Sequence, residues 1–447
     1  MNSLATDAPQ PALILDPGLA PHLHHLQLRQ LGGRVIGIAD NRFTDLLSVV
    51  GGPGCAVCNG NPWDLRRENI CQLGYRLGGQ GELTRATAPA PAAPPWPVAT
   101  PAPPLELDLP APPLELDLPA LRLGRQSRYG FLPLGQSTHR ENISLDSIDT
   151  PATLLTLSHW PANKTPVEHK ANLSTTSALG FLQQGLTVDR AQVITSDHFD
   201  LDGLASVYAF LAPEHALGHR QLLIDIARLG DFSRGTSAQA LHCAFALHAL
   251  AARVRVDPQA SNDRQLLTRF AALLPQMADV LDNTRRYAPL YAPAMLALQR
   301  SEALLADPGT VIEEYPGIDL VVFVLPEQGW DGLGEYCGLS PVAVHNRSRC
   351  GVLAMVRQGR VEIRQRYESW VERISGIARP RRDLAIFARA LQEAERTPGQ
   401  WHYDGVQEIM PALRFVASRP SSHASSTLLA ELRQFLEQAP VAWDANA

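Results

Sequence analysis

A proline-rich segment divides this chain of 447 residues and limits where a globular domain can form. Residues 88–119 contain 12 prolines and no basic residue, and the nonapeptide APPLELDLP occurs twice in tandem, at 102–110 and 111–119. Proline fixes the backbone angle φ and removes a hydrogen-bond donor, so such a segment is expected to be extended and polyproline-like. We predict a linker over residues 88–122, and a peptide that is presented to a partner is the alternative.

The linker separates a short N-terminal segment from a longer C-terminal region. Residues 1–87 carry apolar runs at 11–18 and 34–39 with a helical pattern between them at 21–33, which predicts a small α/β segment. Beyond the linker, short buried strands alternate with amphipathic helices. This alternation predicts an α/β domain over 123–310, in which a mostly parallel sheet is flanked by helices. A smaller α+β domain with an antiparallel meander is expected over 311–447.

Charge and composition exclude several classes of protein. The net charge of −6 is unlike that of a protein that coats nucleic acid through a broad basic face. No apolar run reaches the roughly 18 residues that a membrane span needs, and the start of the chain lacks the pattern of a secretory signal. We therefore expect a cytoplasmic protein that does not bind a membrane, and the sequence leaves its oligomeric state open.

The segment richest in chemistry is VITSDHFDLDGLASVYAFL, residues 193–211. A predicted strand ends here in polar residues, and a predicted helix follows at once. His198, Asp200 and Asp202 alternate, and residues two apart in extended backbone face the same side. Such a convergence is costly unless a cation neutralises the carboxylates. The pattern predicts a site for Mn²⁺, with Mg²⁺ or Zn²⁺ as alternatives, and a polar turn that caps a helix is the structural alternative.

This stretch resembles the first motif of the DHH phosphoesterase superfamily, above all its RecJ-like branch, in which a strand ends in D-x-D-x-D-G and a helix of small residues follows. Histidine at the first acidic place is a departure from the RecJ-like form. The resemblance implies a divalent centre, with manganese as the expected ion, that activates water against a phosphate ester or anhydride. It also implies that the first three matching positions are catalytic. The matching positions are His198, Asp200, Asp202, Gly203, Ala205 and Ser206.

At longer range, residues 159–371 are similar to an uncharacterised bacterial family of unknown function. A site for two metal ions needs ligands from more than one strand end. His159 ends a predicted strand and Asp231 follows a predicted helix, and we predict that both complete the metal site. Asn163 and Lys164 lie in a proline-bracketed loop after His159 and are expected to contact the substrate. A structural or surface role is the alternative for each of these four residues.

A second group of substrate contacts is expected near the C-terminal meander. His345, Asn346 and Arg347 follow a predicted strand at 341–344. By resemblance of arrangement to the smaller closing domain of the superfamily, they are candidates to bind the substrate phosphate, Arg347 through the fixed fork of its guanidinium. An ordinary hairpin loop is the alternative.

Together these features predict a metal-dependent phosphoesterase. Its expected substrate is a small phosphorylated molecule or a short oligonucleotide, because the overall charge is negative. The alternative is a non-catalytic ligand-binding or regulatory protein that is derived from the same fold. The intact alternating acids favour the enzyme, and the lack of an Asp-His-His triplet in the chain favours the alternative.

Overall fold

The computed structural model describes five strands before residue 100 and residues 120–123, 128–327, 334–375, 379–417 and 419–445. Backbone contacts divide the chain into two compact units, residues 1–100 and 101–447. In the described part of the second unit, no helix has both the length and the apolar character needed to cross a membrane.

The first unit contains two small antiparallel sheets. Its strands are β1 (Leu26–Leu31), β2 (Arg34–Ala39) and β3 (Leu47–Val49) in one sheet, and β4 (Tyr75–Leu77) and β5 (Leu83–Arg85) in the other. The strand predicted at 34–39 is confirmed, whereas the helix predicted at 21–33 is wrong because β1 occupies part of that range. Leu26 and Leu28 alternate with polar residues, which is the period of a strand. The strand predicted at 11–18 and nearly all of the linker lie outside the described residues.

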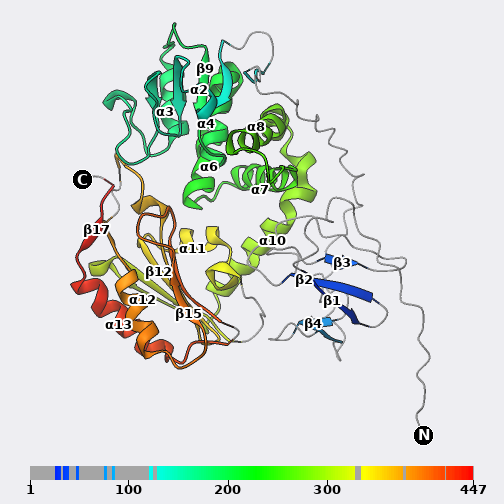
Figure 1. Ribbon diagram of the computed structural model, residues 1–447. Helices are drawn as coiled ribbons and strands as arrows, with labels where there is room; N and C mark the ends of the chain where they lie inside the picture. Colours follow the sequence, from blue (N-terminus) through cyan, green and yellow to red (C-terminus); the bar gives the residue numbers. More distant parts are fainter. Residues whose placement is uncertain are drawn as a thin grey trace. The chain divides into compact units, whose positions relative to one another are not determined.

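A four-stranded parallel sheet dominates the first half of the second unit (Figure 1). All of its pairings are parallel, and Ile143 of the second strand in the chain is level with Ile194 of the fourth. Its strands, in spatial order, are β6 (Gly130–Pro133), β9 (Val193–Ser196), β7 (Asn142–Leu145) and β8 (Thr153–Leu157).

Helices cover this sheet and form most of the core. Every residue of α4 (Leu201–Leu211) is buried, because this helix packs between the sheet and its neighbours α3 (Ser174–Gln183) and α6 (Arg220–Phe232). The predicted parallel sheet flanked by helices is therefore confirmed. The remaining helices of this half are α2 (Leu134–Ser137), α5 (Pro213–Gly218), α7 (Ala238–Arg253), α8 (Asn262–Leu273), α9 (Met277–Asp282) and α10 (Ala288–Leu305).

A six-stranded mixed sheet forms the second half. Only β11 and β12 pair in parallel, and α11 (Pro341–Arg347) lies between them in the chain. Side chains of β11 alternate between two cores: Val321 and Phe323 join the core of the first half, and Leu320 and Val322 pack towards α12 (Ala385–Ala394) and α13 (Ser425–Gln438). The strands, in spatial order, are β10 (Val311–Tyr315), β11 (Leu320–Val324), β12 (Val352–Arg357), β13 (Arg360–Gln365), β16 (Ala412–Val416) and β15 (Gln400–Tyr403).

This half confirms the smaller C-terminal α+β portion and corrects one of its elements. The strand predicted at 341–344 is the first turn of helix α11. Proline is tolerated in a first helical turn because its missing N–H has no partner there, and Pro341 occupies that place. A short antiparallel pair, β14 (Arg381–Arg382) and β17 (Val441–Trp443), completes the unit.

Candidate metal centre

Three neighbouring parallel strands end in acidic or histidine side chains. Asp146 follows β7 directly, His159 lies two residues beyond β8, and His198 lies two residues beyond β9. Because the carboxyl ends of parallel strands meet at one edge of a sheet, these residues are brought together. Asp146 has a backbone φ of 49°, in the left-handed region that aspartate tolerates better than most residues.

The inner part of the centre surrounds the imidazole of His159. Its Nε2 atom lies 3.3 Å from Oδ2 of Asp231, 3.6 Å from Oδ1 of Asp146 and 3.6 Å from Oδ2 of Asp202. All four side chains have no exposed surface. Three carboxylates therefore face one imidazole in the interior, and they carry more negative charge than that single group can balance.

The outer part of the centre surrounds His198. Its Nε2 atom lies 3.0 Å from Oδ2 of Asp200 and 3.4 Å from Oδ2 of Asp146. The side chains of His198 and Asp200 keep 27% and 29% of their surface exposed, so this part opens to solvent. Asp146 thus contributes Oδ1 to the inner part and Oδ2 to the outer part, which is the arrangement of a bridging carboxylate.

The protein orients these groups through hydrogen bonds behind them. Nδ1 of His159 donates to the carbonyl oxygen of Asn172 at 2.8 Å, so the lone pair of the neutral ring lies on Nε2, towards the carboxylates. The carboxylate of Asp202 accepts the N–H groups of Ser174 and Thr175, at 2.8 and 2.7 Å, in the first turn of α3. These bonds fix the ligand atoms before any ion binds.

Asp200 caps the helix that follows the centre. Its Oδ1 accepts the N–H of Gly203 at 2.7 Å, while its Oδ2 faces His198. A methyl group on Gly203 would lie 3.3 Å from Oδ2 of Asp146 and 3.3 Å from Oδ1 of Asp200. Glycine therefore leaves room for two carboxylates at this end of α4.

Four buried atoms of the centre have no hydrogen-bond partner among the described residues. They are Nε2 of His159, Oδ2 of Asp146 and both carboxylate oxygens of Asp231. Each unsatisfied buried polar group costs about 1–3 kcal/mol, and more when it is charged. A cation among these atoms satisfies all of them, and imidazole nitrogen with carboxylate oxygen is a donor set for Mn²⁺, Mg²⁺ or Zn²⁺. The buried aspartate and histidine groups can therefore hold a metal ion.

The same crowding shifts the pKa values of the centre. Burial alone would lower the pKa of His159, but its contact with Asp231 and the charge of Asp202 raise it to about 10. Burial and the charge of Asp146 raise the pKa of Asp202 to about 7. Burial and the neighbouring aspartates also raise the pKa of Asp231 well above its ordinary value. Without a cation, the centre holds protons that a metal ion has to displace.

The outer pair shows shifts of opposite sign. Burial would raise the pKa of Asp200, but the charge of His198 lowers it to about 2. Burial would lower the pKa of His198, but Asp200 and then Asp146 raise it far above its ordinary value. Without a metal ion, His198 and Asp200 therefore form an ion pair at neutral pH.

The structure brings together all five residues that we predicted as metal ligands, in a geometry that differs from the prediction. Asp202 lies in the first turn of α4 rather than in an extended segment, so it faces the inner part while His198 and Asp200 form the outer part. Asp231 lies in the last turn of α6 rather than in a loop. Sequence reasoning missed Asp146, although it follows a short strand directly, and a polar residue at a strand end was the signal that identified His159.

The residues predicted to bind substrate near the meander make structural contacts and are not part of the group of metal ligands. His345 is buried, and its Nδ1 donates to the carbonyl of Phe232 at 2.9 Å while its Nε2 lies 3.1 Å from the hydroxyl of Tyr336. Burial lowers the pKa of His345 well below its ordinary value, so the ring is neutral. Asn346 bonds to the backbone of Gly235, and Arg347 is exposed.

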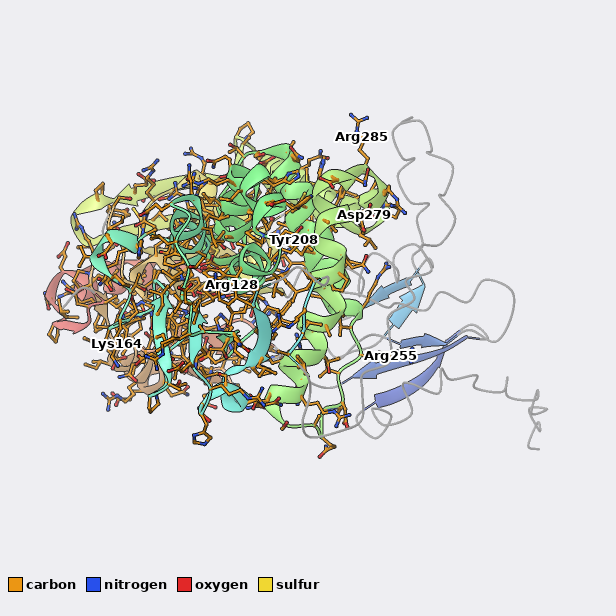
Figure 2. All side chains as sticks on the ribbon, turned by 90° about the horizontal axis from the view of Figure 1, so that it is seen from above. Arg128, Lys164, Tyr208, Arg255, Asp279 and Arg285 are labelled. Atoms are coloured by element: carbon orange, nitrogen blue, oxygen red, sulfur yellow. The ribbon has the colours of Figure 1, made fainter. Side chains whose placement is uncertain are left out.

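Asn163 and Lys164 also make structural contacts. The amide of Asn163 donates to the carboxylate of Glu372 at 2.8 Å. The ammonium of Lys164 pairs with Asp149, and 73% of the lysine side chain is exposed. Figure 2 shows Lys164 near the edge of the view, in keeping with a surface position. The polar partners of both side chains lie outside the metal centre.

An arginine cluster that sequence reasoning missed lies beside the centre. Glu368 is 2.8 Å from Arg366 and 3.9 Å from Arg234, and the guanidinium of Arg373 lies 5.6 Å from the ring centroid of Phe232, the neighbour of Asp231. Burial and the charge of Arg366 lower the pKa of Arg234. The carboxylate of Glu368 therefore faces Arg366 and Arg234 beside the acidic centre.

The fold and the centre define an α/β protein with a buried cluster of aspartate and histidine at the carboxyl edge of a parallel sheet. Residues 127–447 match the model of a protein family described as a family of unknown function (DUF6687). The chain belongs to this family. Comparisons with the curated proteins and with the solved structures gave no match.

Proposed function

We propose that the protein is a metal-dependent phosphoesterase with a two-metal centre of the manganese type. The observation that carries this proposal is the position of Asp146, whose two oxygens face two different imidazoles, His159 and His198. A carboxylate shared in this way is typical of centres that hold two ions roughly 3.5–4 Å apart. The resemblance of residues 198–203 to the first DHH motif supports the same function.

The two parts of the centre differ in access to solvent, and this difference assigns their roles. The inner residues are fully buried, so their role is to bind an ion and to fix its position. The exposed edges of His198 and Asp200 lie where a substrate can approach. When bound, the ions supply a water of lowered pKa and polarise a phosphoryl oxygen.

The arginine cluster favours an anionic substrate. Arg234 and Arg366 face the carboxylate of Glu368, and the guanidinium of Arg373 lies 5.6 Å from the ring centroid of Phe232, next to Asp231. Guanidinium groups bind phosphate oxygens in a fixed fork geometry and neutralise charge that develops during phosphoryl transfer. We therefore propose a small phosphorylated molecule or a short oligonucleotide as the substrate.

Hydrolysis of a panel of phosphate monoesters, diesters and short oligonucleotides tests this function, with inorganic phosphate measured for the monoesters and the freed alcohol or shortened oligonucleotide measured for the others. We expect hydrolysis that needs Mn²⁺, stops with a chelator and returns when Mn²⁺ is added. Asp146→Asn should remove it, whereas Asp225→Asn should not, because Asp225 pairs with Arg228 on α6 outside the centre. Metal-loaded protein that binds phosphorylated ligands without turning any of them over would contradict the enzyme and support the ligand-binding alternative.

A further inference from the structure

A second group of metal-ligating side chains lies outside the centre described above. His215 lies in α5, His219 follows the end of that helix, and Asp282 ends α9. Nε2 of His219 lies 2.9 Å from Oδ1 of Asp282, and Nε2 of His215 lies 3.2 Å from Oδ2 of the same carboxylate. The donor atoms of all three residues lie within 4.8 Å of one another.

The spacing of these atoms fits a small tetrahedral ion. Zinc binds histidine nitrogen and carboxylate oxygen at about 2.0–2.1 Å, so donor atoms around a tetrahedral zinc are about 3.3 Å apart. Oδ1 of Asp282 lies 2.9 Å from Nε2 of His219 and 3.3 Å from Nε2 of His215, and both separations are close to that value. Two histidines four residues apart on one helical turn, with a carboxylate from another element, make a three-ligand set that leaves the fourth position to water.

A buried tyrosine supports one of the ligands from behind. The hydroxyl of Tyr208, on α4, lies 2.7 Å from Nδ1 of His215. The phenol oxygen can accept a hydrogen bond from Nδ1 of His215. In that tautomer the lone pair of the ring lies on Nε2, towards Asp282, as metal-bound histidines require.

The alternative is a network of hydrogen bonds without an ion. The two imidazole rings lie 4.6 Å apart, centroid to centroid, so two protonated rings would repel each other around the single carboxylate of Asp282. Two neutral rings can offer that carboxylate hydrogen bonds but gain no charge pairing. A divalent cation gives both nitrogens and the carboxylate a favourable partner at once.

We propose that His215, His219 and Asp282 bind a zinc-type ion, separate from the proposed phosphoesterase centre. The ion links the junction of α5 and α6 to the end of α9. The helices α5 and α6 are consecutive, whereas α9 lies much later in the chain. The site therefore acts as a cross-link between helices.

Zinc content after equilibrium dialysis of the full chain against Zn²⁺ tests this site. We expect His219→Ala to bind one equivalent less than the parent protein. Asp282→Asn keeps the size of the side chain and an oxygen, and it should bind zinc at this site at least tenfold more weakly. His139→Ala is the matched control, because His139 is exposed and belongs to neither group, and it should keep the parent content.

The outcome is independent of the phosphoesterase proposal. Asp146→Asn should lose zinc from the buried centre and still keep the equivalent that His219→Ala removes. Circular dichroism establishes that each variant is folded. Equal zinc content in the parent, folded His219→Ala and folded Asp282→Asn proteins would overturn the site.

Discussion

Replacing Asp231 should have opposite effects on the thermal stability of the metal-free protein and on the stabilisation by metal. Both of its carboxylate oxygens are buried without a hydrogen-bond partner among the described residues, and its only close contact of opposite charge is His159 at 3.3 Å. If Asp231 is present to bind an ion, it destabilises the metal-free protein. Asp231→Asn should therefore raise the melting temperature without metal and remove much of the rise that Mn²⁺ causes.

The magnitude follows from burial and charge. An unsatisfied buried charge costs more than the roughly 1–3 kcal/mol of an unsatisfied neutral group. Asparagine still leaves two buried polar atoms at this position, so the gain comes from removal of the negative charge, and the lost attraction of His159 offsets part of it. A net gain of about 1–3 kcal/mol remains for Asp231→Asn. At about 2.1 cal/mol/K per residue, a unit of this size gains about 1–4 °C. In the parent, Mn²⁺ at a hundredfold excess over its Kd adds about 2.7 kcal/mol, and the variant should lose most of this.

Thermal unfolding of the full chain, followed by circular dichroism with chelator and then with Mn²⁺, measures both effects. Asp225→Asn is the matched control on the same helix, because Asp225 pairs with Arg228 at the surface and should change neither value. A metal-free Asp231→Asn protein that melts several degrees below the parent would show that Asp231 stabilises the fold as the partner of His159. That result would refute the reasoning.

Four further predictions follow from the same contacts. The pKa of His159 is raised to about 10, so the stability that its proton contributes is present below about pH 6.5 and lost as pH rises to about 10. The melting temperature of the metal-free protein should therefore fall over this pH range. The increase in melting temperature that Mn²⁺ causes should become larger over the same range. His198→Ala should weaken Mn²⁺ binding in calorimetry and His198→Asp should retain it, and equal affinities for both variants and the parent would remove His198 from the centre. Gly203→Ala places a methyl group 3.3 Å from two carboxylate oxygens and should weaken Mn²⁺ binding roughly tenfold, with little change in the metal-free melting temperature. Deleting residues 88–119 should leave the melting temperature of the second unit unchanged, and a large drop would show that the linker packs on it.

The parallel sheet could be predicted from two of its strands, β8 and β9, because each contains a short apolar run that leads into a polar loop or a helix. Parallel strands buried on both faces leave this pattern in the sequence. The helix at 341–347 could not be predicted in the same way, because PVAV is equally a buried strand and a first helical turn. The tertiary structure identifies it as a helix: the segment connects the parallel strands β11 and β12, and parallel strands need a crossover connection, which is usually helical.

Some residues of the metal centre could likewise be predicted from the sequence, and others could not. The acids after β9 could be predicted from local alternation alone, because they lie in one stretch of sequence. Asp146 lies more than 50 residues earlier in the chain, and its place beside His198 depends on the spatial order β9-β7-β8. Likewise, Arg234 lies more than 100 residues before Arg366 and Glu368, and an arginine-rich sequence gives no signal that these residues meet.

The pair of metal positions on either side of Asp146 is the central claim, and anomalous diffraction from crystals grown with Mn²⁺ tests it most directly. We predict two anomalous peaks on either side of the Asp146 carboxylate. The inner peak should be bound by His159, Asp202 and Asp231, and the outer peak by His198 and Asp200. Well-ordered Asp146, His159 and His198 with no anomalous peak between them, at Mn²⁺ concentrations that saturate other sites, would contradict the account.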